Sequence, residues 1–301
     1  MDLEIAKQKF IEFTSEIKSE DLCDFINWIT ESDEFSFKES SDIVLESIAE
    51  DIRGAVPFEA VLPSESIYIP TTGRNADCTK DVTIHVDNFL FTDDYLDDMV
   101  EQGKFSRNYC TACGSRDTKP LTFVSHSASP STLKFIFKKA FPDLSNKTVV
   151  DIGSRLGPIL YGAHLYTSCP RIIGIEINRD LCEIQKGIIE KYAMKERVSV
   201  INDDVNNCSN VLMSADVVVM NNVFEFFADT CRVLELWKFI ISTVRGPNKL
   251  LLTIPSLEES FEPLGMTSLM DSWVESEVFL PKDDVEVDGD DIVDVHLYKL
   301  K

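Results

Sequence analysis

The chain has little glycine, little proline and no long apolar run. Its 301 residues include 12 Gly and 12 Pro, while 44% are hydrophobic and 10% are aromatic. This composition excludes a collagen-like, low-complexity or wholly disordered protein. No stretch approaches the roughly 18 consecutive apolar residues of a membrane-spanning helix, so we expect none. The length fits one large domain or two modest ones.

A secretory signal is also missing, because the first residues do not run from a basic segment into an apolar one. We therefore expect a cytoplasmic or nuclear protein. The eight cysteines fit such a reducing compartment, since most are scattered through apolar or helical segments rather than arranged as a disulfide framework.

Basic side chains are scarce: 29 Lys and Arg stand against 52 Asp and Glu, a formal net charge of -23. Such a charge opposes binding to nucleic acid without a partner protein, because affinity for phosphates comes from cations. The excess lies at the ends: residues 1–120 hold 11 basic and 26 acidic side chains, residues 131–250 hold 15 and 13, and residues 251–301 hold 3 and 13. The acidic ends favour either a basic protein substrate or simply a solubilising surface.

A second metal-binding half-motif is absent as well. Cys110 and Cys113 form a C-x-x-C followed by glycine, which is one half of a zinc ribbon, but a structural zinc needs four ligands. The nearest candidates, Cys78, His85 and His126, stand at spacings that match no standard finger. The sequence favours a turn with two packed thiols, and no metal is expected.

The sequence predicts an α-rich accessory region at residues 1–120 and a second domain at residues 121–301. Apolar residues recur at helical spacing at 3–29 and 37–52, and a proline-containing stretch at 57–70 breaks the period. A strand-like alternation at 81–91 then precedes an acidic helical run at 93–102.

From residue 131 short β-branched runs alternate with helical segments, which is typical of parallel strands joined by crossover helices. We expect strands at 148–152, 171–175, 198–201, 216–220 and 249–254, and helices at 131–141, 156–166, 180–192 and 228–244. Two last strands, 272–280 and 291–299, flank an acidic turn at 281–290 and predict an antiparallel hairpin. The expected fold is a doubly wound α/β sheet with this hairpin closing one edge.

The first core strand runs into Asp151-Ile152-Gly153-Ser154-Arg155-Leu156-Gly157 and then a helix. A glycine directly after a strand lets the backbone turn tightly and brings a ligand close to the first N–H groups of the helix. Alone, this signal also fits a turn that merely needs glycine.

Three further strands end in polar side chains. Glu176 closes the second strand, where a carboxylate can accept bonds from both hydroxyls of a ribose. Asp203 and Asp204 follow the third strand, and either carboxylate can accept from an adenine amino group. Asn221 and Asn222 follow the fourth. The carboxyl ends of parallel strands meet at one edge of a sheet, so these residues predict a ligand site there.

With these motifs, residues 131–300 resemble the class I, seven-stranded S-adenosylmethionine-dependent methyltransferases. The resemblance implies S-adenosylmethionine as cofactor, with its amino-acid end at the segment Asp151–Gly157, its ribose at Glu176 and its adenine at Asp203 or Asp204. Ser154 belongs to that first segment. Arg155 departs from the family, which has its middle glycine there, so its side chain must point away from the cofactor or pair with the cofactor's carboxylate.

The segment Asn221-Asn222-Val223-Phe224 resembles the family's fourth motif, beside the transferred methyl group. It is similar to the Asn-Asn-x-aromatic stretch of the seven-stranded histone lysine methyltransferases, and loosely to the Asn-Pro-Pro-Tyr motif of amide and adenine N-methyltransferases, without the prolines. The resemblance implies that Asn221, Asn222 and Phe224 form the catalytic centre, with Asn221 also touching the cofactor. Glu225 is a candidate base or, equally, a solvated loop carboxylate.

The loop before the first core helix often closes over the cofactor in the resembled family. His126 lies in this loop, so it is either a contact to the methionine carboxylate or a structural hydrogen-bonding residue. Ser125 has the same two interpretations.

The sequence therefore predicts an S-adenosylmethionine-dependent methyltransferase acting on a nitrogen of a protein substrate. Methylation of RNA or of a small molecule is the alternative within the class. A catalytically inactive scaffold of the same fold is a second alternative, favoured by Arg155. A nicotinamide-dependent oxidoreductase is disfavoured by the terminal hairpin and by glycine spacing that departs from G-x-G-x-x-G.

Overall fold

The computed structural model describes residues 3–18, 21–31, 40–58, 61–69, 78, 82–104, 106–111, 118–277 and 294–301. The chain divides into two compact units, Met1–Ile43 and Val44–Lys301. This division falls well before the boundary near residue 120 that the change of sequence rhythm predicts. The division into an accessory region and a second domain near residue 120 stays a prediction.

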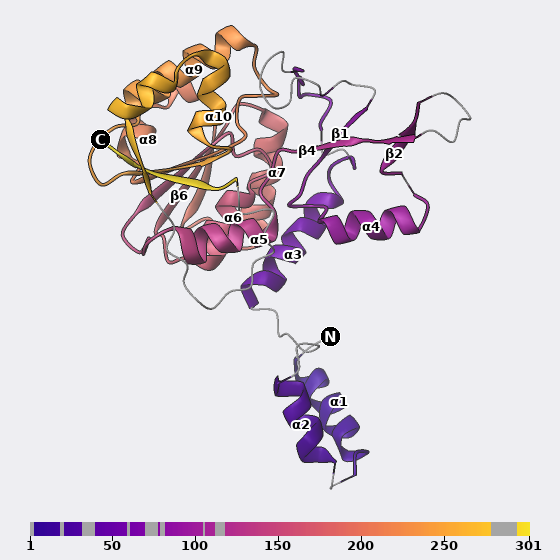
Figure 1. Cartoon of the computed structure of the whole chain (residues 1–301). Coiled ribbons are helices and arrows are strands. Elements are labelled where there is room, and N and C mark those ends of the chain that lie inside the picture. Colours follow the sequence, from indigo (N-terminus) through magenta and orange to yellow (C-terminus); the bar gives the residue numbers. More distant parts are fainter. Residues whose placement is uncertain are drawn as a thin grey trace. The chain divides into compact units, whose positions relative to one another are not determined.

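The first unit contains the helices α1 (Leu3–Ser15) and α2 (Leu22–Glu31) (Figure 1). The helical spacing of residues 3–29 is thus divided between two helices. An aromatic contact joins them, because the ring centroids of Phe13 in α1 and Phe25 in α2 lie 5.7 Å apart. Within α2, the ring centroids of Phe25 and Trp28 lie 5.8 Å apart.

A seven-stranded sheet forms the second unit's centre, with the strand order β10-β11-β9-β8-β5-β6-β7. The strands β5, β6, β7, β8 and β9 are parallel, and β11 runs antiparallel to both β9 and β10. Their bounds are β5 Thr148–Ile152, β6 Arg171–Glu176, β7 Val198–Asn202, β8 Val217–Asn221, β9 Leu250–Ile254, β10 Val274–Glu277 and β11 His296–Leu300. The predicted α/β class, doubly wound sheet and terminal antiparallel hairpin are confirmed. The turn predicted at 281–290 lies outside the described residues.

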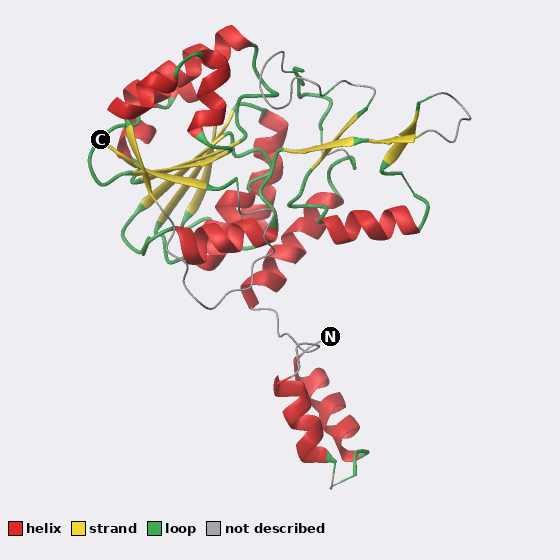
Figure 2. Ribbon diagram, viewed as in Figure 1, coloured by secondary structure: helices red, strands yellow, loops and turns green. Residues whose placement is uncertain are grey.

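Both faces of the sheet are buried under helices (Figure 2). Alternate residues of a strand point to opposite faces, so Val149 packs in one core and Val150 in the other. One face is covered by α5 (Pro130–Phe135), α6 (Pro158–Tyr166) and α7 (Arg179–Lys191), and the other by α8 (Ser209–Ser214), α9 (Thr230–Thr243) and α10 (Leu257–Phe261). This double burial explains why the strands are continuously apolar.

The helices differ from expectation in three places. The helix expected at 131–141 is split, because α5 continues as the π-helical turn η2 (Ile136–Ala140). The sequence reading missed α8, which is only one and a half turns long. Short 3-10 turns follow β7 and α10: η3 (Val205–Asn207), η4 (Glu262–Leu264) and η5 (Thr267–Ser272).

The segments before the sheet add α3 (Ser40–Arg53), α4 (Asp93–Glu101) and four short strands. Strand β1 (Thr83–Val86) pairs in parallel with β4 (Thr122–Ser125), and β2 (Asn108–Cys110) pairs antiparallel with β3 (Thr118–Pro120). The strand expected at 81–91 is therefore shorter, and β2, β3 and β4 were not predicted. The β1–β4 pair sets Val86 opposite Ser125, directly before the first core helix.

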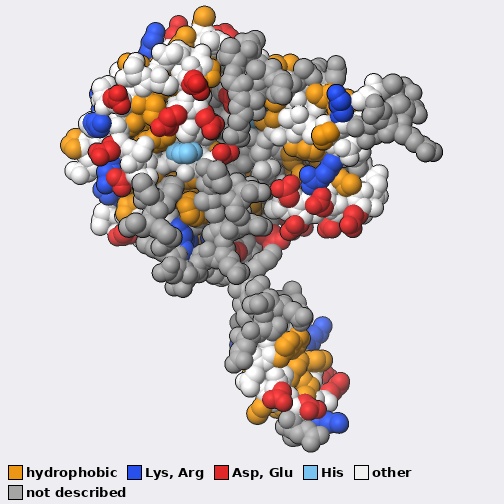
Figure 3. Space-filling model, viewed as in Figure 1, with side chains coloured by type: hydrophobic (Ala, Val, Ile, Leu, Met, Phe, Trp, Pro, Cys, Tyr) orange, Lys and Arg blue, Asp and Glu red, His pale blue; other side chains and the backbone are white. Residues whose placement is uncertain are grey.

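The outer face of α4 is acidic. Figure 3 shows acidic side chains gathered there, consistent with five Asp and Glu in its nine residues. Across the described ranges, no helix combines the length and the apolar character needed to cross a membrane.

Gly157 and Gly187 give a matched test of the packing between β5 and α6. Gly157 has φ +87°, and a Cβ there would lie 2.7 Å from the Tyr161 ring. Gly187 lies within α7 with open space around it. Gly157→Ala is expected to lower the free energy of unfolding by about 2 kcal/mol or more. Gly187→Ala is expected to raise it by about 0.5–1 kcal/mol. Urea unfolding measures both, and equal effects of the two variants would contradict the packing described.

Candidate functional site

Two adjoining cavities lie at the carboxyl ends of the parallel strands. The smaller cavity, of about 320 Å³, is lined from the ends of β5, β6, β7 and β8. The larger cavity, of about 570 Å³, lies beside it. They share a wall formed by Tyr68, Asn221, Asn222, Val223, Phe224 and Ala228. Two ligands bound side by side would therefore meet at the end of β8.

The turn after β5 depends on left-handed backbone. Gly153 has φ +70°, and a Cβ there would come within 2.9 Å of Val223 Cγ1. Arg155 also has a positive φ, 48°, which costs a non-glycine residue about 1–2 kcal/mol. This conformation explains why glycine is the usual residue at this place in the resembled family.

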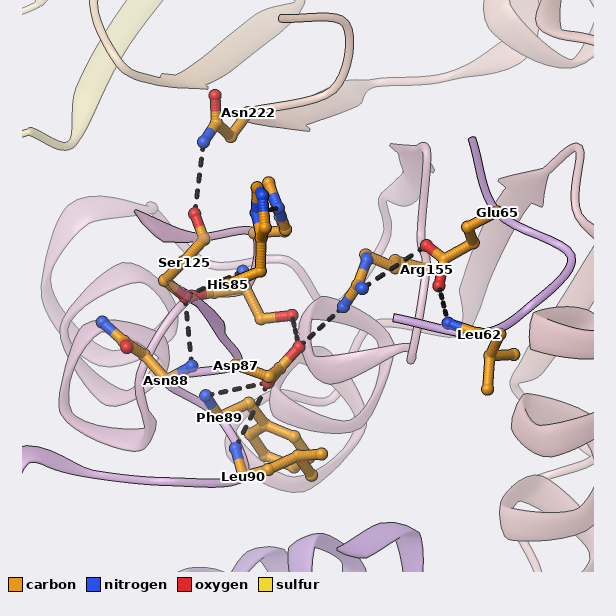
Figure 4. A network of polar contacts seen from close by, with 12 residues as sticks. Leu62, Glu65, His85, Asp87, Asn88, Phe89, Leu90, Ser125, Arg155 and Asn222 are labelled. Atoms are coloured by element: carbon orange, nitrogen blue, oxygen red, sulfur yellow. Dashed lines mark hydrogen bonds and ion pairs between the residues drawn. The ribbon is translucent and has the colours of Figure 1, made fainter. Parts of the chain in front are cut away.

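The Arg155 guanidinium is buried in an ion-pair network (Figure 4). Its Nη1 lies 2.9 Å from Asp87 Oδ2, and its Nη2 lies 3.4 Å from Glu65 Oε1. The backbone N–H of Leu62 donates to the other oxygen of Glu65. Arg155 is among the residues that line the smaller cavity, and its guanidinium pairs with carboxylates of this chain.

Asp87 is the most buried member of this network. It also accepts bonds from the Ser127 hydroxyl and from the N–H groups of Phe89 and Leu90. Burial raises the pKa of Asp87, and the nearby Arg155 charge works in the opposite direction. An anion so enclosed needs its partner, because an uncompensated buried charge is costly.

Glu176 lies at the end of β6 in the smaller cavity. Its Oε1 accepts from the N–H of Asn178 at 2.8 Å, and its Oε2 accepts from the N–H of Arg155 at 2.9 Å. Burial raises the pKa of Glu176, although these two N–H groups partly oppose the rise. Each carboxylate oxygen has two lone pairs, so both can still accept a bond from a ligand hydroxyl.

Asp203 and Asp204 both line the smaller cavity but differ in their bonds. Asp204 Oδ2 forms an ion pair with Arg232 at 2.6 Å, and its Oδ1 caps η3. Asp203 uses Oδ1 to accept from Asn207 at 2.7 Å. No arginine of the described residues forms an ion pair with Asp203, so Asp203 is the better candidate for binding a ligand amino group.

Asn222 has the left-handed φ of 51°, which an asparagine tolerates better than most residues. Its amide Nδ2 donates to the Ser125 carbonyl at 3.2 Å, and Figure 4 shows its amide oxygen turned the other way. Phe224 packs edge-on against Trp237 at 5.5 Å between centroids. Glu225 lines only the larger cavity.

His126 lines the smaller cavity and forms a pair with His85. His126 Nε2 lies 2.9 Å from His85 Nδ1, and Phe226 and Phe227 contact the His126 ring edge-on. Burial, then the charges of Arg155 and His85, hold the pKa of His126 well below its usual value. The imidazole is therefore neutral near pH 7.

Three of the predicted cofactor residues line neither cavity. Asp151 is buried inside β5, where burial and the charge of Glu176 raise its pKa well above the usual value. The Ser154 hydroxyl donates to Gln185 within the core, and Gly157 begins α6.

The sequence reading missed the segment 61–69, which contributes Glu65 and Tyr68. The Ser64 hydroxyl lies within hydrogen-bond distance of Asn178, and the Tyr68 N–H donates to the Phe226 carbonyl at 2.8 Å. No spacing or motif marks this segment, because its contacts are with residues far along the chain. The segment 81–91 was expected only as a strand, so the part of Asp87 in the network was not predicted, and His85 was considered only as a possible zinc ligand.

Only the first cysteine of the candidate zinc motif lies among the described residues. Cys110 ends β2 and is exposed, while Cys113 lies outside the described residues. Within the ranges that the structure describes, no group of three or more His, Cys, Asp and Glu could hold a metal ion.

Removing the charge of Asp87 tests the buried network. Asp87→Asn removes a carboxylate that pairs with the buried Arg155 guanidinium, and it is expected to lower the free energy of unfolding by about 3–5 kcal/mol. The control Glu183→Gln breaks an exposed pair with Lys186, where about 0.5 kcal/mol or less is expected. Urea unfolding compares them, and equal losses would contradict a stabilising role for the network.

His126 predicts a pH dependence. The unfolded chain, with an ordinary histidine pKa near 6.5, binds more protons than the folded chain below that pH. The stability that His126 contributes is therefore present above pH 6.5 and is lost as the pH falls. Between pH 7.5 and 5.5, the native protein should lose more free energy of unfolding than His126→Gln. The carboxylates Asp87, Asp151 and Glu176 are common to both proteins, so identical pH profiles would contradict the assignment.

No protein family model matches the chain, and no curated protein matches it. Solved structures do. An RNA methyltransferase from Salinibacter ruber, in complex with S-adenosyl-L-homocysteine, is 15% identical over 55% of this chain and 84% of its own, with a TM-score of 0.34. Precorrin-6y C5,15-methyltransferase from Geobacter metallireducens is 13% identical over 57% and 88%, with a TM-score of 0.41. A methyltransferase from Geobacter sulfurreducens is 16% identical over 56% and 76%, with a TM-score of 0.37. The chain's own strand order, with antiparallel β11 between β9 and β10, agrees with the seven-stranded fold that the sequence resemblance implies.

Proposed function

We propose that the protein is an S-adenosylmethionine-dependent methyltransferase. The observation that carries the proposal is the pair of cavities that share a wall at the end of β8. The smaller cavity contains Glu176, whose carboxylate can bind ribose hydroxyls, and the larger cavity does not. In this assignment the smaller cavity takes the methyl donor and the larger cavity takes the acceptor. Glu176 would hold the ribose, Asp203 the adenine, and the turn Gly153–Arg155 the amino-acid end.

The charges around the smaller cavity support this cofactor. Asp204 and Arg232 form an ion pair and neutralise each other. The remaining charges are those of one arginine, Arg155, and of four carboxylates, Glu65, Asp87, Glu176 and Asp203. A net negative environment favours a sulfonium cation with an ammonium group. It disfavours the pyrophosphate of a nicotinamide dinucleotide, which would face carboxylates instead of cations. The residues present therefore fit S-adenosylmethionine.

When bound, this cofactor supplies an electrophilic methyl group. Methyl transfer is an in-line displacement, so alignment of the acceptor contributes much of the catalysis. The amides of Asn221 and Asn222 lie in the shared wall and can accept from, or donate to, an acceptor nitrogen. Phe224 excludes water from the same place. Glu225 faces the larger cavity, where a carboxylate can take up the proton that nitrogen releases.

A nitrogen of a protein is the acceptor we propose. The net charge of -23 and the acidic face of α4 suit a basic partner. An RNA acceptor is less compatible with this charge. An inactive scaffold is also less favoured, since the charge of Arg155 is matched by Glu65 and Asp87 and needs no ligand anion. The cytoplasm or the nucleus is the compartment we propose.

Glu176→Gln tests the donor site by calorimetric titration. The native protein is expected to bind S-adenosylmethionine with micromolar affinity, and the variant at least about 10-fold more weakly, because bonds from ribose hydroxyls to a charged acceptor are weakened. The control Glu183→Gln, on the exposed face of α7, should bind like the native protein. Binding of nicotinamide dinucleotide instead, or of neither, would contradict the proposal.

A further inference from the structure

Glu65 brings a carboxylate into the smaller cavity from a segment that precedes the sheet. It belongs to the segment 61–69 and lines the cavity together with its neighbours Ser64 and Ser66. Its side chain is only 5% exposed, and Figure 4 shows its carboxylate facing the Arg155 guanidinium. Burying a charge is costly unless a partner compensates it, so a carboxylate in this place is stabilised by a cation nearby.

The bonds that Glu65 makes leave part of its carboxylate unused. Oε2 accepts from the Leu62 N–H at 2.7 Å, whereas Oε1 lies 3.4 Å from Arg155 Nη2. The second distance is longer than the about 2.7–2.9 Å of a close charge-assisted hydrogen bond. Arg155 lies closer to Asp87, at 2.9 Å. A carboxylate offers about four acceptor sites, so Glu65 can accept further bonds from a ligand.

The charges of Glu65 and Glu176 affect each other within the smaller cavity. Burial raises the pKa of Glu176, two backbone N–H groups oppose the rise, and the charge of Glu65 adds to it. The two carboxylates therefore repel each other. A cation bound next to Glu65 would reduce this repulsion and stabilise both charged forms.

The place of Glu65 in the cavity indicates which part of the cofactor it meets. In the proposed assignment the ribose lies at Glu176, the adenine at Asp203 and the amino-acid end at the turn Gly153–Arg155. Glu65 pairs with the arginine side chain of that turn, so it lies at the amino-acid end. This end of S-adenosylmethionine carries an ammonium group, which has three donors and binds most strongly to a carboxylate.

Asp151, the acidic residue of the motif after which the chain turns, does not supply that partner. Its side chain is buried inside β5 and does not line the smaller cavity. Burial, and then the charge of Glu176, raise the pKa of Asp151 well above its usual value, which favours the uncharged acid. The ammonium group therefore needs a different carboxylate.

The described acidic residues that line the smaller cavity are Glu65, Glu176, Asp203 and Asp204. Two of them are assigned to the nucleoside, and Asp204 is neutralised by Arg232. Glu65 is the carboxylate that remains. The resemblance to the class I methyltransferases gives it no role, because no strand end or glycine motif marks the segment 61–69.

We propose that Glu65 binds the ammonium group of S-adenosylmethionine and thereby makes the smaller cavity selective for ligands that carry this group. The inference rests on the proposed function and adds to it a cofactor-binding residue from the segment 61–69. The close pair of Arg155 and Asp87 does not depend on Glu65, so Arg155 retains a partner when Glu65 binds the ligand. Bound cofactor would then hold the segment 61–69 against the turn after β5.

Two ligands that differ in one group test the inference by calorimetric titration of the full-length protein. S-adenosylhomocysteine carries the ammonium group, whereas 5′-(3-carboxypropyl)thio-5′-deoxyadenosine has hydrogen in its place and keeps the carboxylate. We expect the native protein to bind S-adenosylhomocysteine at least about 10-fold more tightly than this deamino analogue. Equal affinities for the two ligands would overturn the inference without any variant.

Glu65→Gln removes the charge of Glu65 and preserves its size. The variant is expected to bind S-adenosylhomocysteine at least about 10-fold more weakly than the native protein, because the charge-assisted bond is lost. Its affinity for the deamino analogue should stay within about two-fold of the native value, since that ligand has no ammonium group. Binding of the analogue also shows that the variant is folded.

Two control variants separate the charge of Glu65 from its surroundings. Ser64→Ala alters the same segment without removing a charge, because it breaks the contact between Ser64 and Asn178. Glu183→Gln removes a charge from the exposed face of α7. Both variants should retain the native ratio of the two affinities. Equal weakening of both ligands in Glu65→Gln would show a structural role for Glu65 and overturn the inference.

The outcomes distinguish this inference from the proposed function. If the native protein binds S-adenosylmethionine and Glu65→Gln retains the preference for the ammonium group, the role of Glu65 is wrong and the methyltransferase proposal stands. If the native protein binds neither S-adenosylmethionine nor S-adenosylhomocysteine, both proposals are overturned.

Discussion

The buried ion pair between Arg155 and Asp87 is the constraint on which the site depends. An arginine in a left-handed turn is unfavourable by itself, and a carboxylate with no exposed surface is more so. Each is acceptable because the other is present, and Glu65 completes the network. The pair joins the turn after β5 to two segments that precede the sheet. The segment with Glu65 therefore forms part of the wall of the smaller cavity rather than a separate appendage.

The division into two cavities follows from the strand ends. Strands β5, β6 and β7 bring Arg155, Glu176 and Asp203 to one cavity, whereas β8 ends between the two. Among the described residues, Arg155 and Arg232 line the smaller cavity together with carboxylates, whereas the charged residues that line the larger cavity are carboxylates. A fold that serves many acceptors can thus change its substrate through the residues of one cavity while the other keeps its cofactor contacts.

Pattern alone predicted the parallel strands closely, because their apolar runs are buried on both faces and end in polar residues. β5 begins and ends where expected, at Thr148 and Ile152. The sequence pattern could not predict the network around Asp87 or the pair His85–His126. These contacts join residues about 40 or more positions apart, in loops and short strands. The effect of Arg155 could not be read from the motif either. Its partners lie in segments that carry no sequence signature of their own.

A crystal structure of the protein with S-adenosylhomocysteine tests the central claim most directly. The account predicts the ribose hydroxyls within hydrogen-bond distance of Glu176, the adenine beside Asp203 and the sulfur facing the wall that Asn221 and Asn222 share with the larger cavity. A ligand bound elsewhere on the sheet, or one whose ribose makes no contact with Glu176, would contradict it.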